Sequence, residues 1–279
     1  MTFSIVARSA DGSAFGVAVA SKFLAVGAMV PAAQAGVGAI ATQAYANLAY
    51  RPQGLALLAT GVSAAGVVAA LTAADDGRVQ RQLGVVGASG EGATFTGAGC
   101  HPWAGGVTGD GYAIQGNILA GPQVVERMQE AFCASDPQAP LHRRLYAALL
   151  AGDRAGGDRR GRQSAALLVV APGQGYGGTG DVVADLRVDD HPDPVVELGR
   201  LLDLHSLVFD KPDPATLLPL TGELAEEVAR RLATLGFRPG SGGLDEALAL
   251  WSGIENLEER FVPGHIDPRV LDHLRAQSG

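Results

Sequence analysis

Thr2 combines the two groups that an amide-cleaving nucleophile needs. Because Thr2 is small, we expect methionine aminopeptidase to remove Met1 and to expose a free α-amino group. Such an amine has a pKa of about 8, so it can accept the proton of the threonine hydroxyl at neutral pH. A Lys22 ammonium close to it would keep the amine neutral and would favour a developing alkoxide. Many proteins begin with Met-Thr without being nucleophiles, so this interpretation needs support from the rest of the chain.

A glycine-rich loop further along the chain concentrates charge in Asp158, Arg159, Arg160 and Arg162. Its arginines could hold a substrate carboxylate through two parallel hydrogen bonds. Internal salt bridges are the alternative, and we expect them for at least two of the arginines. The expected internal partners are three aspartates near the next strand, namely Asp185, Asp189 and Asp190.

The segment 189–193 offers carboxylate and imidazole ligands within five residues, and Asp190 and His191 are its weak candidates for a divalent metal. Acidic clusters of this kind more often cap a helix, here one that begins near Pro194, so we predict no metal site. Cys100 and His101 are adjacent on an extended segment and would point apart, which argues against a Cys–His dyad.

Composition excludes several classes of function. The 279-residue chain is 47% hydrophobic but only 5% aromatic, so small aliphatic residues must fill its core. Its net charge is −8, without a basic stripe interleaved with aromatics, and we therefore expect no nucleic-acid partner. The stretch 23–50 has no charged side chain, but its proline, glutamines and many alanines suit buried strands better than a membrane span. Two cysteines and no secretory signal predict a cytoplasmic protein.

The elements that must position Thr2 begin with a hairpin. Thr2–Ala7 and Phe15–Ser21 read as strands joined by a turn, which returns Lys22 to the neighbourhood of Thr2. Further strands are predicted at 25–30, 36–42, 82–87, 92–97, 111–117, 164–171 and 182–189. Helices are predicted at 45–60, 63–74, 121–132, 141–150 and 194–208, with a loop at 100–106. Hairpins alternating with helices in pairs favour stacked antiparallel sheets covered by helices, and no glycine motif supports nucleotide chemistry.

The chain resembles an N-terminal nucleophile (Ntn) hydrolase, and more specifically the bacterial Ntn-hydrolase-like family called domain of unknown function 1028. Beyond the first hairpin, four sequence blocks in order carry this resemblance, and they are Ala41–Asn47, Gln115–Gly121, Gly156–Ala165 and Asp185–His191. The resemblance implies an α+β fold, a four-layer αββα sandwich over residues 1–208. It also implies amide hydrolysis through an acyl-enzyme, with Thr2 as nucleophile and its own amine as base.

That reaction requires donors for an oxyanion, and Asn117 with the Gly116 backbone amide could supply them. Asn117 could equally be a turn former ahead of a helix. Gln43 and Asn47 lie in an otherwise apolar run, so each needs a partner if it is buried. They could bind substrate amide groups, although bonds to loop backbone are the more frequent arrangement. With Asp158 and Arg160, these residues complete the candidate substrate site.

The tail resembles a peptidoglycan-binding module over residues 217–279, after a proline-bearing linker at 209–216. Its matching blocks are Trp251–Arg260 and Gly264–Pro268. Because a cytoplasmic chain rarely meets intact peptidoglycan, we interpret the module first as a recognition or assembly element.

Two functions follow from the sequence. The first is an Ntn-type amidohydrolase acting on a small or peptide-like amide without a cofactor, a nucleic acid or a membrane. The second is a non-catalytic protein of the same fold that binds or assembles through its C-terminal module. Self-association stays open in both. The state of Met1 and the surroundings of Thr2 distinguish the two.

Overall fold

The computed structural model describes residues 2–279, so Met1 lies outside the described residues. Within that range the chain is a mixed α and β protein with nine α-helices and twelve strands. It divides into two compact units between Leu201 and Leu202, and each is described here by itself.

The first unit contains a six-stranded antiparallel sheet with β1 at its centre. Its strands, in spatial order, are β10 (Val182–Val188), β9 (Ser164–Val170), β2 (Phe15–Ser21), β1 (Thr2–Arg8), β8 (Tyr112–Asn117) and β7 (Gly105–Gly109). The register pairs Phe3 with Ala20 of β2 and with Gly116 of β8. Because both neighbours run antiparallel to β1, the start of β1 and the ends of β2 and β8 lie side by side at one border of the sheet. This border, formed by strand ends, is called the Thr2 edge.

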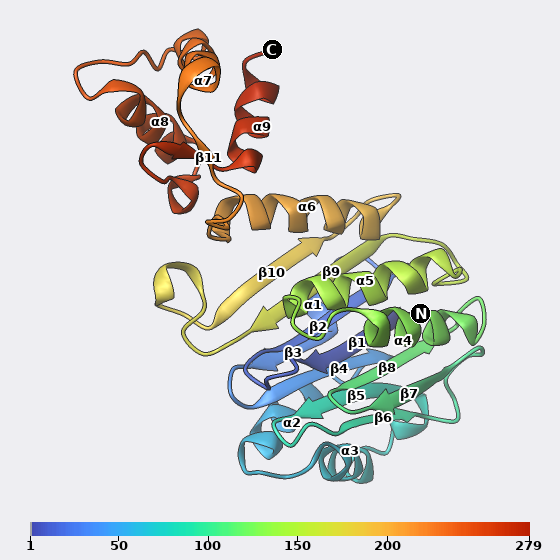
Figure 1. Ribbon diagram of the computed structural model, residues 1–279. Coiled ribbons are helices and arrows are strands. Elements are labelled where there is room, and N and C mark those ends of the chain that lie inside the picture. Colours follow the sequence, from blue (N-terminus) through green and yellow to red (C-terminus); the bar gives the residue numbers. More distant parts are fainter. Residues whose placement is uncertain (1) are drawn as a thin grey trace. The chain divides into compact units, whose positions relative to one another are not determined.

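A second, four-stranded antiparallel sheet faces the first (Figure 1). Its strands, in order, are β3 (Pro31–Gln34), β4 (Gly38–Ala44), β5 (Arg81–Gly87) and β6 (Gly92–Thr96). Small apolar side chains fill most of the space between the sheets, among them Val6, Val17, Ala39 and Val86. Alanine and valine therefore fill the space that aromatic residues occupy in many cores, as the composition predicts.

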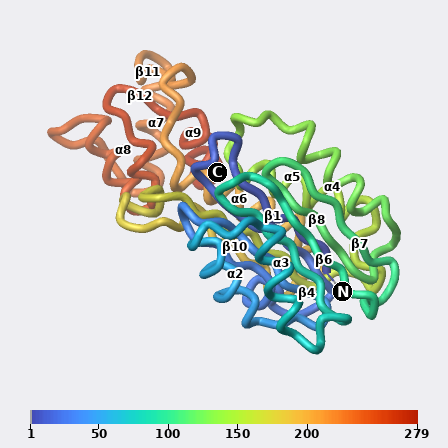
Figure 2. Tube along the Cα trace, turned by 90° about the horizontal axis from the view of Figure 1, so that it is seen from below, coloured from blue at the N-terminus to red at the C-terminus, as the bar shows by residue number. Residues whose placement is uncertain are grey.

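Helices cover the outer face of each sheet. On the six-stranded sheet, Phe3 and Ile5 of β1 pack against α4 (Gln123–Ala134), α5 (Leu141–Arg154) and the first turns of α6 (Pro194–Phe209). On the four-stranded sheet, Ile40 and Leu83 pack against α2 (Tyr50–Ala59) and α3 (Ala64–Ala73), which Figure 2 shows from below. Ser63 caps α3, because its hydroxyl accepts from the Gly66 amide. Two short 3-10 helices, η1 (Arg78–Gln80) and η2 (Tyr176–Gly178), lie in connections.

Two local predictions were wrong. The predicted strand at 25–30 is instead the short helix α1 (Val26–Met29), which follows Ala25 in the left-handed region at φ 52°. Pro31 begins β3, where it lies on an edge strand and needs no ladder donor. The segment predicted as a loop at 100–106 contains the start of β7, a strand whose glycines give no apolar alternation to recognise.

The second unit is a small helical body with its own core around Trp251. It contains α7 (Gly222–Thr234), α8 (Gly243–Ile254), η3 (Glu258–Arg260), α9 (Pro268–Gln277) and a two-residue ladder of β11 (Leu218–Pro219) with β12 (His265–Ile266). The Arg260 guanidinium, 4% exposed, pairs with Asp267 at 2.6 Å and also donates to the carbonyls of Ser206 and Leu207. This buried cation therefore ties the end of α6 to the rest of the unit.

None of the helices within residues 2–279 combines the length and the apolar character needed to cross a bilayer.

Candidate functional site

Thr2 lies at the head of the central strand and is almost fully buried. Its side chain belongs to a residue only 6% exposed, and its register partner in β8 is Asn117. The Thr2 and Ser21 hydroxyl oxygens are 3.1 Å apart, which is hydrogen-bond distance. The hairpin predicted from the sequence therefore places the end of β2 beside Thr2, as expected.

A network of buried amides connects the two sheets at the Thr2 edge. Gln43 of β4 donates to the carbonyl of Thr2 at 3.2 Å and to Gln82 Oε1 at 2.8 Å. Gln43 Oε1 accepts from the Ser4 hydroxyl at 2.7 Å, and Ser4 in turn accepts from Gln115 Nε2 at 2.7 Å. All four side chains are at most 1% exposed. Gln43 therefore supports Thr2 from within the core.

Gln82 is the centre of this network. Its Oε1 accepts from both Gln43 and Asn117, and its Nε2 donates to the Gly116 carbonyl at 2.7 Å and to Thr96 at 2.9 Å. Sequence reasoning missed Gln82 and Ser21. A single glutamine at the polar start of an otherwise apolar strand was the available signal for Gln82, because a buried amide must find partners.

Asn117, a candidate oxyanion donor, lies beside the head of β1 as the register partner of Thr2. Its Nδ2 donates to Gln82 Oε1 at 2.9 Å, which fixes the orientation of the amide. Gly116 lies inside β8, paired with Phe3 on one side and Gly105 on the other. Because backbone amides within a central strand point towards neighbouring strands, Asn117 is better placed than the Gly116 amide to reach a ligand.

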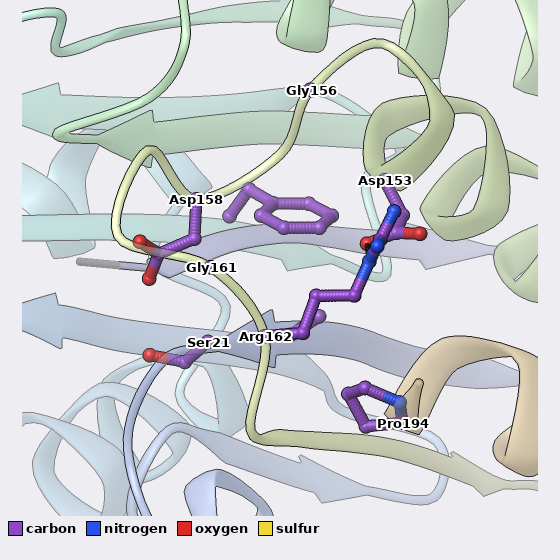
Figure 3. Close-up of a pocket in the computed structure, with 9 residues that line it drawn as sticks. Ser21, Asp153, Gly156, Asp158, Gly161, Arg162 and Pro194 are labelled. Atoms are coloured by element: carbon purple, nitrogen blue, oxygen red, sulfur yellow. Dashed lines mark hydrogen bonds and ion pairs between the residues drawn. The ribbon is translucent and has the colours of Figure 1, made fainter. Parts of the chain in front are cut away.

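A pocket of about 130 Å³ opens next to Ser21 (Figure 3). Its charged lining residues are Asp153, Asp158 and Arg162, and Pro194 forms another part of the wall. Figure 3 shows the Arg162 side chain extending towards Asp153, with Ser21 and Asp158 on the opposite side. The pocket is thus polar and adjoins Ser21, the residue whose hydroxyl contacts Thr2, while Thr2 itself is not among the lining residues.

The charged loop is held by internal bonds, but not by those predicted. Asp158, whose side chain is 2% exposed, accepts from the Lys22 amide at 2.8 Å and from the Arg160 amide at 2.8 Å. The Arg160 guanidinium donates to Asp158 and to the Lys22 carbonyl. Arg162 pairs with Asp153, so the predicted salt bridges to Asp185, Asp189 and Asp190 were wrong. Asp185 forms its ion pair with Arg187 instead.

The Lys22 side chain is exposed, and it is not among the residues that line this pocket. What Lys22 contributes to the site's framework is its backbone, which bonds to Asp158 and Arg160.

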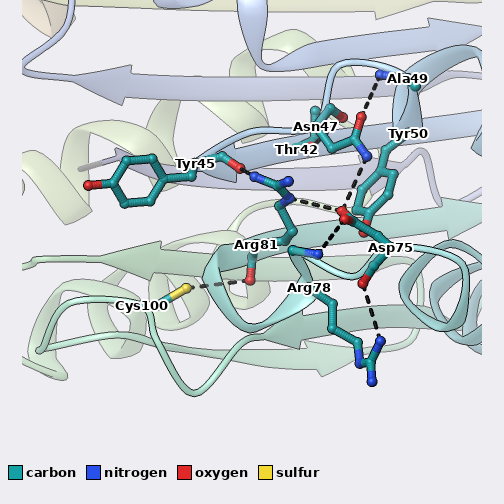
Figure 4. A network of polar contacts seen from close by, with 10 residues as sticks. Thr42, Tyr45, Asn47, Ala49, Tyr50, Asp75, Arg78, Arg81 and Cys100 are labelled. Carbon is teal, nitrogen blue, oxygen red and sulfur yellow. Dashed lines mark hydrogen bonds and ion pairs between the residues drawn. The ribbon is translucent and has the colours of Figure 1, made fainter.

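Asn47 belongs to a second polar network, outside the pocket (Figure 4). Its Nδ2 donates to Asp75 at 3.2 Å, and the same carboxylate accepts from Arg81 at 2.9 Å and from the Tyr50 hydroxyl at 2.8 Å. The hydrogen bonds from Arg81, Tyr50 and Asn47 lower the pKa of Asp75, while burial and the Asp75 charge raise the pKa of Tyr50. This network fastens the loop after β4 to the end of α3.

The acidic segment before α6 is also internally bonded. Asp190 accepts from Gln163 Nε2 at 3.1 Å, and His191 Nδ1 accepts from the Asp193 amide at 3.0 Å. In the part of the chain that the structure describes, no three His, Cys, Asp or Glu side chains form a cluster that could hold a metal ion. Cys100 donates to the Arg81 carbonyl, whereas the His101 ring lies 6.5 Å from that of Tyr45.

Two residues at the Thr2 edge have positive φ angles, which are energetically unfavourable for residues other than glycine. Ala44, the last residue of β4, has φ 67°, and Ile118, directly after Asn117, has φ 51°. The left-handed region is rare for a β-branched residue such as Ile118. Strained positions of this kind persist only where the surrounding structure enforces them, and they cluster at functional sites.

The chain belongs to the family of unknown function called DUF1028, whose model matches residues 2–198. The model described as "Putative peptidoglycan binding domain" matches residues 208–274. These matches confirm the resemblance to DUF1028 and to the peptidoglycan-binding module. No curated protein matches the chain in sequence.

Among solved structures, the chain is similar to the crystal structure of protein SPO2555 from Silicibacter pomeroyi, itself assigned to DUF1028. The two share 32% identity with a TM-score of 0.66, over 81% of this chain and 92% of that one. A second match is Anbu (ancestral beta-subunit) from Yersinia bercovieri, at 16% identity and over 76% of this chain and 98% of that one. Its TM-score of 0.31 is too low to carry an argument about the fold.

Proposed function

We propose that the protein is an N-terminal-threonine amidohydrolase that cleaves an amide bond in a small or peptide-like substrate. The observation that carries this proposal is the position of Thr2: a nearly buried hydroxyl at the head of the central strand, 3.1 Å from the hydroxyl of Ser21, a residue that lines a polar pocket. The proposal requires removal of Met1, because the base is the α-amine of Thr2 itself.

In this mechanism the Thr2 hydroxyl attacks the substrate carbonyl while its amine takes the proton. The amine then passes that proton to the leaving nitrogen, and water releases the acid from the acyl-enzyme. The Asn117 amide uses one N–H for Gln82, and its other N–H donates to the oxyanion. An oxyanion donor of this type contributes about 3 kcal/mol to the transition state. Lys22, whose side chain is exposed, keeps its predicted role as the cation that favours the neutral amine.

We further propose that the first unit is a four-layer αββα sandwich of the Ntn type. Two facing sheets, each with helices on its outer side, support this assignment. The strained backbone at Ala44 and Ile118 also supports a site at this edge, since such strain is retained where geometry is under functional constraint.

The test is the intact mass of protein made in its native host, with and without a small electrophile that acylates N-terminal threonines. We expect a mass that lacks methionine, and one adduct that disappears in Thr2→Ala. Retained Met1 together with no adduct would contradict the hydrolase proposal.

A non-catalytic binding or assembly function is the second candidate, and the match of residues 208–274 to a peptidoglycan-binding model favours it. In this case residues 217–279 act as a recognition module joined to residues 1–208 by the segment 209–216. An unreactive Thr2 in protein that still binds a cell-wall fragment through residues 217–279 would support this function over hydrolysis.

A further inference from the structure

The pocket beside Ser21 is lined by two carboxylates, Asp153 and Asp158, and by the guanidinium of Arg162. These three groups differ in how many hydrogen bonds they already make within the protein. Asp158 already accepts three hydrogen bonds, from the backbone amides of Lys22 and Arg160 and from the Arg160 guanidinium. Arg160 in turn donates to Lys22 and is not among the residues that line the pocket. Asp158 and Arg160 therefore bond to each other and to the Lys22 backbone, which leaves Asp158 few further hydrogen bonds to offer a ligand.

Arg162 is arranged differently. Its Nε donates to Asp153 Oδ1 at 2.8 Å, and Asp153 is buried, with 8% of its side chain exposed. This bond fixes the plane of the guanidinium and raises the pKa of Arg162, so the group stays charged at physiological pH. The terminal nitrogens are less well bonded: the contact from Nη1 to the exposed Asp193 is 3.5 Å, beyond good hydrogen-bond distance. A better acceptor could therefore displace Asp193.

Two features of the pocket indicate which acceptor that would be. The wall includes Pro194, the first residue of the 16-residue helix α6, where the partial positive charge of a helix start favours an anion. The volume of about 130 Å³ is well below the roughly 300–1,000 Å³ of sites for drug-sized ligands. The pocket therefore suits a compact anionic group, and guanidinium groups match carboxylates through paired hydrogen bonds.

We propose that Arg162, oriented by Asp153, binds a carboxylate of the substrate, so that the substrate class is small amides bearing a carboxylate, such as N-acyl amino acids. This rests on the proposed function, because it places the carboxylate at the Arg162 side of the pocket and the scissile amide at the Ser21 side, next to Thr2. In this arrangement Asp193 is a competing acceptor, and removing its charge improves binding.

The test is binding of N-acetylglycine and its neutral analogue N-acetylglycinamide to the full chain, followed by NMR titration at low salt. Thr2→Ala serves as the background, because it binds without reacting. We expect the carboxylate to bind at least tenfold more tightly than the amide. Arg162→Gln should abolish that preference, and Asp193→Asn should strengthen carboxylate binding severalfold.

Arg187→Gln is the matched control. Arg187 also donates from Nε to an aspartate at 2.8 Å and is 42% exposed, against 45% for Arg162, but it does not line the pocket. Equal affinity for the two ligands, or an Arg162→Gln variant that behaves like Arg187→Gln, would overturn the inference, and a weakened Asp193→Asn variant would do so as well. Carboxylate binding at Arg162 in a protein whose Thr2 forms no adduct with the electrophile would instead overturn the proposed function and leave only the carboxylate site standing.

Discussion

At the scale of single residues, Thr2 depends on neighbours that no short motif reveals. The Ser21 hydroxyl lies at hydrogen-bond distance from its oxygen, and Gln43 holds its carbonyl. These contacts fix the head of β1 from two different sheets. Residue chemistry made Thr2 a candidate nucleophile and the family resemblance strengthened it, and this role stays a prediction. The sequence could not identify Ser21, because a serine at a strand end has many ordinary explanations.

Asp75 provides a prediction about pH. Because Arg81, Tyr50 and Asn47 lower its folded-state pKa, the stability it contributes is present above the unfolded value of about 4 and is lost as pH falls below it. Asp75→Asn should lower the free energy of unfolding by about 1.5–3 kcal/mol at pH 7, with a smaller difference from wild type at pH 3. Urea unfolding at the two pH values measures this.

Asp76→Asn, the change at the exposed neighbouring aspartate, is the control and should follow wild type at both pH values. A difference between Asp75→Asn and wild type that is as large at pH 3 as at pH 7 would show that the charge of Asp75 does not stabilise the fold.

At the scale of elements, the network of buried amides is the feature that joins β1, β4, β5 and β8. Gly84 of β5 makes room for it, since a Cβ there would lie 2.1 Å from Gln115 Oε1. Most strands and helices could be predicted, because alternating apolar residues and caps such as Ser63 are local signals. The register that brings Gln43, Gln82 and Gln115 together is not local, and neither are the partners of Arg160 and Arg162.

Gln82→Leu tests the network. The replacement leaves the Asn117 and Gln43 amides and the Gly116 carbonyl without this partner, so we expect a loss of about 2–4 kcal/mol in the free energy of unfolding. Chemical denaturation is the measurement. Gln80→Ala, at an exposed glutamine two residues away, should change stability by less than about 0.5 kcal/mol. Equal stability of the two variants would show that the network is dispensable for the fold.

At the scale of the whole molecule, the two units have separate cores, and each has its own central polar interaction. In the second unit this is the buried pair of Arg260 with Asp267, which also begins α9 because Asp267 accepts from the Arg269 amide. The three helices of this unit were predicted from helical apolar patterns in residues 223–235, 245–253 and 267–276 of the sequence. The pair was not, because a single arginine in a polar stretch looks like any solvated charge.

Arg260→Ala should destabilise the second unit by about 3–5 kcal/mol, since it leaves the Asp267 carboxylate buried without its cation. Hydrogen exchange followed by mass spectrometry should show faster exchange in residues 202–279 and unchanged exchange in β1, β2 and β8. Arg238→Ala, at an exposed position of the same unit, should match wild type. Faster exchange throughout the chain would show that the two units unfold together.

The layer between the two sheets changes character along its length. It is polar around Ser4 and Gln115 and apolar around Val6 and Val86. Valine contacts tolerate small sliding motions, whereas a chain of paired amides breaks if one sheet moves past the other. The sandwich is therefore stiffest at the end that carries Thr2. A protein built in this way can vary its loops and its far end and still keep the Thr2 hydroxyl in place.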